Sequence, residues 1–179
     1  MGVRDFYLIV IVIVALVIDY IRRKKIKEMF ICDSQFGILC FKRNRYNESC
    51  NDLVCYDKRI RFGNYNPTIQ IKNYKKDNHK LYVKALNYVY EIQNEIIESL
   101  CKEIRSYSNS WNLRDKDSNL ITYEYIKENF NVDTIIISIE AGEIIAAIKA
   151  WCDGVIEDQD IAMYINCTKK EIVKYSIEE

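Results

Sequence analysis

The chain has 179 residues, of which 49% are hydrophobic and 29% charged, and its 26 basic and 26 acidic side chains leave no net charge. One proline and five glycines in this composition exclude long disordered tracts. The charge is unevenly placed, because residues 1–76 hold 15 basic and 7 acidic side chains, whereas residues 121–179 hold 5 and 12. Either the two ends neutralise each other in a compact domain, or a basic face meets a membrane and an acidic face meets a partner.

The first element is an apolar run, FYLIVIVIVALVIDYI, which predicts a single transmembrane helix over residues 6–21. The run is short, since roughly 20 apolar residues cross a bilayer. The charge that follows it, over residues 22–28, excludes a cleaved signal peptide. Because positive loops stay in the cytoplasm, we expect a cell-membrane protein with residues 1–5 outside and the large domain in the cytoplasm. The residues expected at the lipid headgroups are Arg22, Arg23, Lys24, Lys25 and Lys27.

After the basic segment the pattern changes to short strands. MFICD and FGILCFKR predict one or two strands, LVCYDKRIRFG contains another, and TIQIKNY alternates Ile69 and Ile71 with polar residues. Polar residues 44–51 and the segment 64–67, which includes the single proline, separate them. We therefore expect about three strands, joined as a meander, before the first helix of the domain.

One long amphipathic helix follows, capped by Asp77 or Asn78 and ended by the polar run 106–110. Its apolar residues recur at three- and four-residue steps, and the residues expected to face the core are Leu81, Ala85, Val89, Ile92, Ile96 and Leu100.

The last third alternates turns and strands. Residues 111–119 are typical of a solvated connection, and Thr122 is expected to cap a short helix over Tyr123–Asn129. Two strands around Ala141 and Gly142 form a hairpin, an acidic loop spans 153–158, and two more strands end the chain. The order of strands, helices and strands indicates an α+β domain over residues 29–179, with an antiparallel sheet of about six or seven strands.

Few side chains here suit catalysis. His79 is the single histidine, and the chain lacks a P-loop, a GxGxxG fingerprint and zinc-ligand spacing. The seven cysteines form no CxxC pair and fall partly inside apolar patterns, which favours structural thiols. No catalytic residue, cofactor, metal or small-molecule substrate is therefore inferred.

Two charged groups leave alternatives open. Asp153, Glu157, Asp158 and Asp160 could hold Ca²⁺ or Mg²⁺, although their spacing is not that of an EF-hand, or they could form a solvated loop. The basic residues of the early strands could protect a sheet edge, contact anionic lipid or bind nucleic acid, and the predicted anchor makes nucleic acid the least favoured. These basic residues are Lys42, Arg43, Arg45, Lys58, Arg59 and Arg61.

The segments ITYEYIKENFNVDTIIISIEAGEII and WCDGVIEDQDIAMYI, with Trp151, Asp153 and Asp158, carry a resemblance across the last third of the chain. Their order of a short helix, a hairpin and an aromatic, acidic loop is similar to that of small bacterial α+β domains of unknown function of the predicted immunity-protein type. The resemblance implies a protein partner such as a toxin.

The sequence thus predicts a membrane-tethered, non-enzymatic protein-interaction module, which could be an immunity protein. The residues expected to bind the partner are Trp151, Asp153, Glu157, Asp158 and Asp160. One alternative is a structural or regulatory membrane protein that self-associates through a sheet edge. A divalent-metal-dependent enzyme is less favoured.

Overall fold

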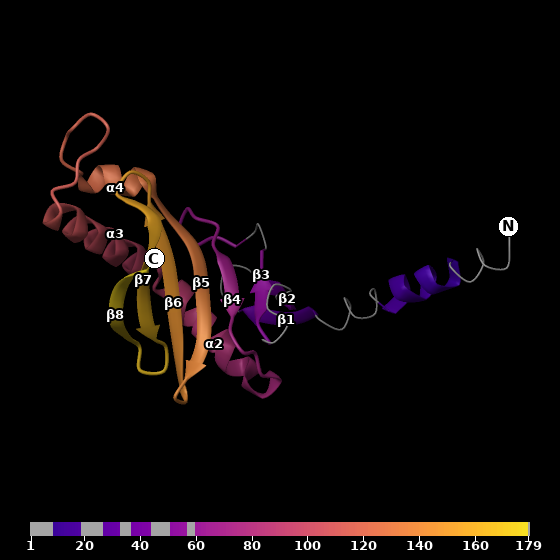
Figure 1. Cartoon of the computed structure of the whole chain (residues 1–179). Coiled ribbons are helices and arrows are strands. Elements are labelled where there is room, and N and C mark those ends of the chain that lie inside the picture. Colours follow the sequence, from indigo (N-terminus) through magenta and orange to yellow (C-terminus); the bar gives the residue numbers. More distant parts are fainter. Residues whose placement is uncertain (1–8, 19–26, 33–36, 44–50, 57–59, 179) are drawn as a thin grey trace.

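The computed structural model of the chain describes residues 9–18, 27–32, 37–43, 51–56 and 60–178. The α+β class is confirmed, since strands come first, then helices, then strands again (Figure 1). The elements are β1 (Lys27–Cys32), β2 (Gly37–Arg43), β3 (Leu53–Cys55), β4 (Thr68–Ile71), the 3-10 turn η1 (Lys76–Asn78), α2 (His79–Glu91), α3 (Gln93–Ser110), α4 (Tyr123–Asn129), β5 (Phe130–Glu140), β6 (Glu143–Cys152), β7 (Ile156–Asn166) and β8 (Glu171–Glu178).

The sheet has eight strands, and their spatial order follows the sequence from β1 to β8. All neighbours are antiparallel except β4 and β5, which run parallel with Ile69 opposite Ile135 and Ile71 opposite Ile137. A parallel pair needs a long crossover connection, and here the helices between β4 and β5 supply it. The predicted antiparallel sheet of six or seven strands is therefore wrong in strand number and in direction at this one pair.

The helix layer contains two helices where the sequence predicted one. The chain leaves helical geometry at Ile92, with φ −99° and ψ 16°, between the end of α2 and the start of α3. The predicted core residues Ala85, Val89, Ile96 and Leu100 are buried, but Leu81 is 44% exposed. The helix ends at Ser110, the last residue of the predicted polar run 106–110.

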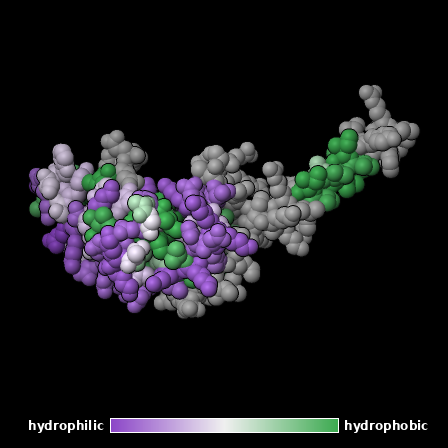
Figure 2. All heavy atoms as spheres, turned by 90° about the horizontal axis from the view of Figure 1, so that it is seen from below, coloured by the Kyte–Doolittle hydropathy of each residue, from purple (hydrophilic) through white to green (hydrophobic). Residues whose placement is uncertain are grey.

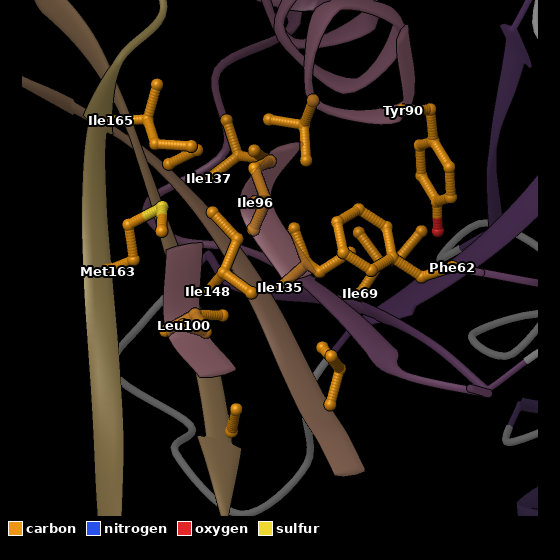
Figure 3. Close-up of a cluster of buried hydrophobic side chains, with 14 of the residues drawn as sticks. Phe62, Ile69, Tyr90, Ile96, Leu100, Ile135, Ile137, Ile148, Met163 and Ile165 are labelled. Atoms are coloured by element: carbon orange, nitrogen blue, oxygen red, sulfur yellow. The ribbon is translucent and has the colours of Figure 1, made fainter. Parts of the chain in front are cut away.

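The core lies between α2 and α3 and one face of β4 to β7. Figure 3 shows Ile96 and Leu100 directed toward side chains from the strands, which come from every second residue. These strand residues are Ile69, Ile135, Ile137, Ile148, Met163 and Ile165, and none has measurable exposure to solvent. Full burial of such a side chain stabilises the fold by about 1.5 to 3 kcal/mol, so this face supplies much of the driving force for folding.

Two local predictions are confirmed in the last third of the chain. The Thr122 hydroxyl accepts a hydrogen bond from the Tyr125 N–H at 3.1 Å and caps α4, which spans the predicted residues. Ala141 and Gly142 form the two-residue hairpin turn between β5 and β6, with φ 49° and 84°. Positive φ at both positions is what a type I′ turn requires, and this turn suits the twist of the strands.

The N-terminal expectation is wrong. Residues 9–18 are helical, and Figures 1 and 2 show this apolar helix apart from the sheet domain, with its large aliphatic side chains 40–64% exposed. Ten helical residues extend about 15 Å, half of a typical hydrocarbon core of about 30 Å. Among the described residues, no helix has both the length and the apolarity needed to cross a bilayer. This contradicts the predicted span over 6–21 and the single-pass membrane location inferred from it.

The predicted lipid-contact residues lie mostly outside the described part of the chain. Arg22, Arg23, Lys24 and Lys25 belong to a range that the structure does not describe, and Lys27 begins β1.

Candidate functional site

The predicted partner-binding residues converge at one end of β6 and β7. Trp151 lies near the end of β6 opposite Asn131 of β5, and its side chain is 37% exposed. Asp153 follows in the turn, where its N–H donates to the Asn129 carbonyl at the end of α4. Because the turn ends at Val155, Asp158 and Asp160 belong to β7, and the predicted loop over 153–158 is shorter than expected.

The same turn is closely held by α4. Gly154 has φ +71°, and a Cβ atom built there would lie 2.5 Å from the Tyr125 hydroxyl. A larger residue would be strained and would push Tyr125 away, so glycine is required for the turn to approach the helix.

Glu157 is also in β7, and the side chains of Glu157 and Asp158 fall outside the described part of the structure.

Trp151 and Asp160 share the face of β4 to β8 that is opposite the helices, and we call this surface the open face. The register identifies it: Ala147 pairs with Tyr164 and Lys149 with Ala162, whereas Ile148 and Met163 on the other face point into the core. Figure 1 shows α2 and α3 on the opposite side of these strands.

Charged and aromatic side chains interact across the open face. Lys149 Nζ lies 3.9 Å from Asp160 Oδ2, and both side chains are partly exposed. Lys174 of β8 places its Nζ 4.5 Å from the centre of the Tyr164 ring, in cation–π geometry. Aromatic residues are enriched at protein interfaces, and the rims of such interfaces are polar.

Sequence reasoning missed the contribution of Lys149, Tyr164 and Lys174 to this surface. The available signal was period-two spacing, since Lys149 and Trp151 are two residues apart on β6, and Asp160 and Tyr164 are four apart on β7. Assigning those positions to a face required the strand register, which the sequence pattern did not supply.

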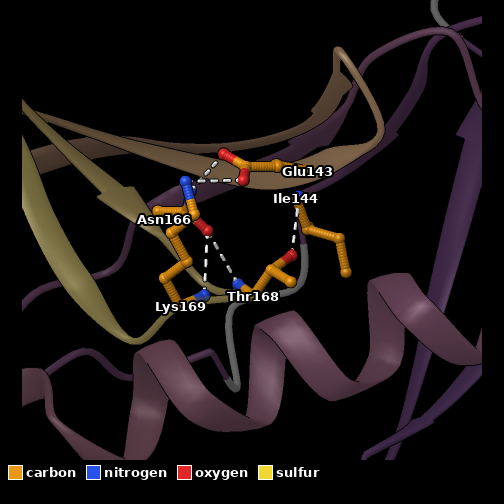
Figure 4. A network of polar contacts seen from close by, with 5 residues as sticks. All are labelled: Glu143, Ile144, Asn166, Thr168 and Lys169. Atoms are coloured by element: carbon orange, nitrogen blue, oxygen red, sulfur yellow. Dashed lines mark hydrogen bonds and ion pairs between the residues drawn. The ribbon is translucent and has the colours of Figure 1, made fainter.

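A polar network fastens the turn between β7 and β8 to the start of β6 (Figure 4). The buried Asn166 side chain donates to Glu143 Oε2 at 2.5 Å and accepts from the N–H groups of Thr168 and Lys169. Lys169 Nζ lies 2.6 Å from Glu143 Oε1, and the hydrogen bonds from Lys169 and Asn166 lower the pKa of the Glu143 carboxyl. This network positions β8 and shows no arrangement suited to catalysis.

Four cysteines, Cys55, Cys101, Cys152 and Cys167, are buried and form no disulfide. Burial raises the pKa of the Cys101 thiol to about 11, of Cys152 to about 12 and of Cys167 to about 11. These thiols stay protonated at neutral pH, whereas nucleophilic cysteines need the thiolate.

His79 is held at the start of α2 by an aromatic partner. Its Nδ1 lies 3.1 Å from the Tyr74 hydroxyl, and the two rings meet edge to face. Within the described residues, no group of three or more His, Cys, Asp or Glu side chains could hold a metal ion.

A shallow groove lies between α3 and α4, lined by Glu98, Lys102, Arg105, Ser106, Asn109 and Tyr123. Glu98 and Lys102 form an ion pair of 2.7 Å there, and Lys127 of α4 lies over the Tyr123 ring. Of the basic residues predicted on the early strands, the structure describes the side chain of Arg61, which donates a hydrogen bond to Asn66 Oδ1; the side chains of the others lie outside the described part.

Neither a family model, nor a curated protein, nor a solved structure matches the chain.

Proposed function

We propose that the domain is a non-enzymatic protein-interaction module that binds a partner protein through the open face. The observation that carries the proposal is Trp151, a large aromatic side chain 37% exposed on a paired strand. Tryptophan is enriched among the residues that dominate binding energy, and a side chain on a rigid strand loses little backbone entropy when it binds.

The chemistry of the surroundings favours a basic partner surface. Residues 121–179 carry 12 acidic and 5 basic side chains, and Asp153 is exposed in the turn beside Trp151. Complementary charge accelerates association and selects partners even where it adds little affinity. The resemblance of the last third to immunity-type domains makes a toxin one protein of this kind.

Site-specific photo-crosslinking tests the proposal, because the chain offers two exposed tryptophans in different places. The photoreactive residue benzoylphenylalanine replaces Trp151 of the full chain in its own cells, and in a matched strain it replaces Trp111, which follows α3 and is 68% exposed. We expect one discrete protein adduct from position 151 and none of that size from position 111.

Charge reversal then tests the role of the acidic residues. Asp153→Lys should reduce the adduct from position 151 several-fold, whereas Asp115→Lys, in the loop after α3, should leave it unchanged. Equal labelling from the two tryptophan positions, or no adduct from position 151, would show that the open face does not bind a protein.

A further inference from the structure

The outermost strand β8 has a free edge. It pairs with β7 on one side, and no described strand pairs with its other side. Alternate residues of such a strand direct backbone N–H and C=O groups outward, where another strand can extend the sheet. β8 is eight residues long and contains no proline, so its backbone N–H groups are all present.

The helix-side face of this strand is apolar and exposed. Ile172, Val173 and Ile177 are 47%, 53% and 40% exposed, which is unusual for three large aliphatic side chains on one strand. The register explains how they share a face: Ile177 lies opposite Ile161 and Ile172 opposite Ile165, and both partners are core residues. The shift in register between Tyr164 and Ile165 leaves Val173 as the extra residue of a bulge beside Ile172.

The one lysine within β8 does not protect this apolar strip. Lysine often blocks edge pairing when its charge points into the path of an incoming strand. Here Lys174 lies opposite Tyr164, on the open face, and its Nζ is held over the Tyr164 ring. The helix-side face of β8 therefore has Tyr175 between Val173 and Ile177 and no charged residue among them.

We propose that β8 binds β8 of a second copy of this chain, antiparallel, about a twofold axis through Tyr175. Directly opposite residues of an antiparallel pair lie on the same face, which restricts the possible registers. With Tyr175 on the axis, Lys174 lies opposite Ser176 of the second copy, and Ile177 lies opposite the bulge formed by Ile172 and Val173, which leaves Glu171 opposite Glu178 only at the two ends of the pairing. An axis through Lys174 instead places two lysines opposite each other at the centre of the pairing, which is unfavourable.

A second copy suits this strand better than an unrelated one because the pairing is self-complementary. Each copy supplies Ile177 for the other copy's bulge, so both apolar strips leave solvent together, as in other isologous interfaces. The contact is limited to one strand and its apolar strip, so we expect reversible dimers in the micromolar range.

The dimer also has a consequence that rests on the proposed function. A continuous sheet has its twofold axis perpendicular to the strands and the sheet, so both open faces point the same way. Two Trp151 surfaces on one side would bind a bivalent partner, or two copies on one assembly, more tightly than one surface alone.

Sedimentation equilibrium of the full chain tests the dimer without any partner. We expect a concentration-dependent monomer–dimer equilibrium in the wild type and at least a tenfold weaker association in Val173→Asp and Ile177→Asp. Leu81→Asp is the matched control, since Leu81 is similarly exposed but lies on α2, and its association should equal that of the wild type. A monomeric wild type, or unchanged association in both β8 variants, overturns the proposal.

Cysteine crosslinking tests the register even if an aspartate variant unfolds. Cα atoms of directly opposite residues are about 4.5 to 5.5 Å apart, within disulfide range, so Tyr175→Cys should form a covalent dimer under mild oxidation. Ser176→Cys is off the axis and should not. Both variants keep the seven native cysteines, so the wild type measures any background dimer. Equal crosslinking at 175 and 176, or none at 175, contradicts the axis. Because these experiments use purified protein alone, their failure leaves the photo-crosslinking result unaffected.

Discussion

The two faces of strands β5, β6 and β7 differ although alternate residues of the same strands form them. On the helix side, Ile135, Ile148 and Met163 have no measurable exposure. The next residue along each of these strands points to the open face. These residues are Ile136, Lys149 and Tyr164, and each is only half-buried. Composition alone does not separate the faces, because aliphatic residues lie on both. Cover by α2 and α3 makes one face a core, and its absence leaves the other as the surface on which we propose that a partner binds.

The largest expected effect comes from truncating a side chain on the buried face, and an equivalent truncation on the open face is its control. Ile148→Ala should lower the free energy of unfolding by about 3 to 4 kcal/mol, since it leaves a cavity against the helices. Ile136→Ala, on the open face of the neighbouring strand, should cost only about 1 kcal/mol because its side chain is half-exposed. Urea unfolding measures both, and similar losses would show that the open face is covered in solution.

Alkaline pH should also act on the buried side, because Cys101, Cys152 and Cys167, the three thiols with raised pKa values, belong to the core. The folded state keeps these protons to a pKa of about 11 or 12, whereas an unfolded thiol loses its proton near 9.0. The unfolded state is therefore favoured as pH rises above about 9, by up to about 1.4 kcal/mol per pH unit for each thiol.

Thermal unfolding between about pH 8 and about pH 10 measures this loss of stability. Cys152→Ala should reduce the slope of stability against pH, whatever it does to stability at neutral pH. A slope identical to that of the wild type would assign the alkaline loss to other groups.

A smaller effect on the free energy of unfolding is expected from the turn between β7 and β8. Asn166→Ala removes the acceptor for two backbone N–H groups and the donor to Glu143, which should cost about 2 kcal/mol. Thr168→Val is the control, since it removes only the acceptor for the Ile144 N–H and should cost less. Chemical denaturation ranks the two variants, and the reverse order would show that the Asn166 network is not what holds the turn.

The smallest effect is expected from the charge pair on the open face. Asp160→Asn should change the free energy of unfolding by about 0.5 kcal/mol or less, because the pair with Lys149 is long and partly exposed. Added salt should shrink even this difference. A loss of several kcal/mol in the free energy of unfolding would mean that this pair is shielded from water. The open face would then be less exposed to solvent than the structure indicates.

The elements that the sequence predicted correctly depend on local chemistry. Thr122 and the seven residues of α4 lie within a few positions of each other, as do Ala141, Gly142 and the strands that they join. A cap and a two-residue turn are decided by adjacent backbone groups, so a pattern of adjacent residues indicates them. The candidate site was partly predicted for the same reason, since Trp151 and Asp153 lie next to a recognisable turn.

The errors concern contacts between distant parts of the chain. The break at Ile92 lies within an apolar stripe that continues from α2 into α3, and the parallel pairing of β4 with β5 joins segments more than sixty residues apart. The predicted transmembrane helix depended on hydropathy and on the charge that follows the apolar run, and the described helix is too short for a span. The placement of Lys149 and Tyr164 beside the acidic residues depended on the register between strands.

By itself, the sequence determined the α+β class, the short capped helix, the hairpin turn and the apolar residues of the core, because each depends on hydrophobic periodicity or on neighbouring backbone groups. Only the tertiary structure decided which face of the sheet the helices cover and which strand is left at its edge. Those outcomes depend on a parallel crossover and on strand register, which are fixed by contacts between residues far apart in the chain. The open face and the exposed strip of β8 are therefore properties of the fold, and both proposed interactions rest on them.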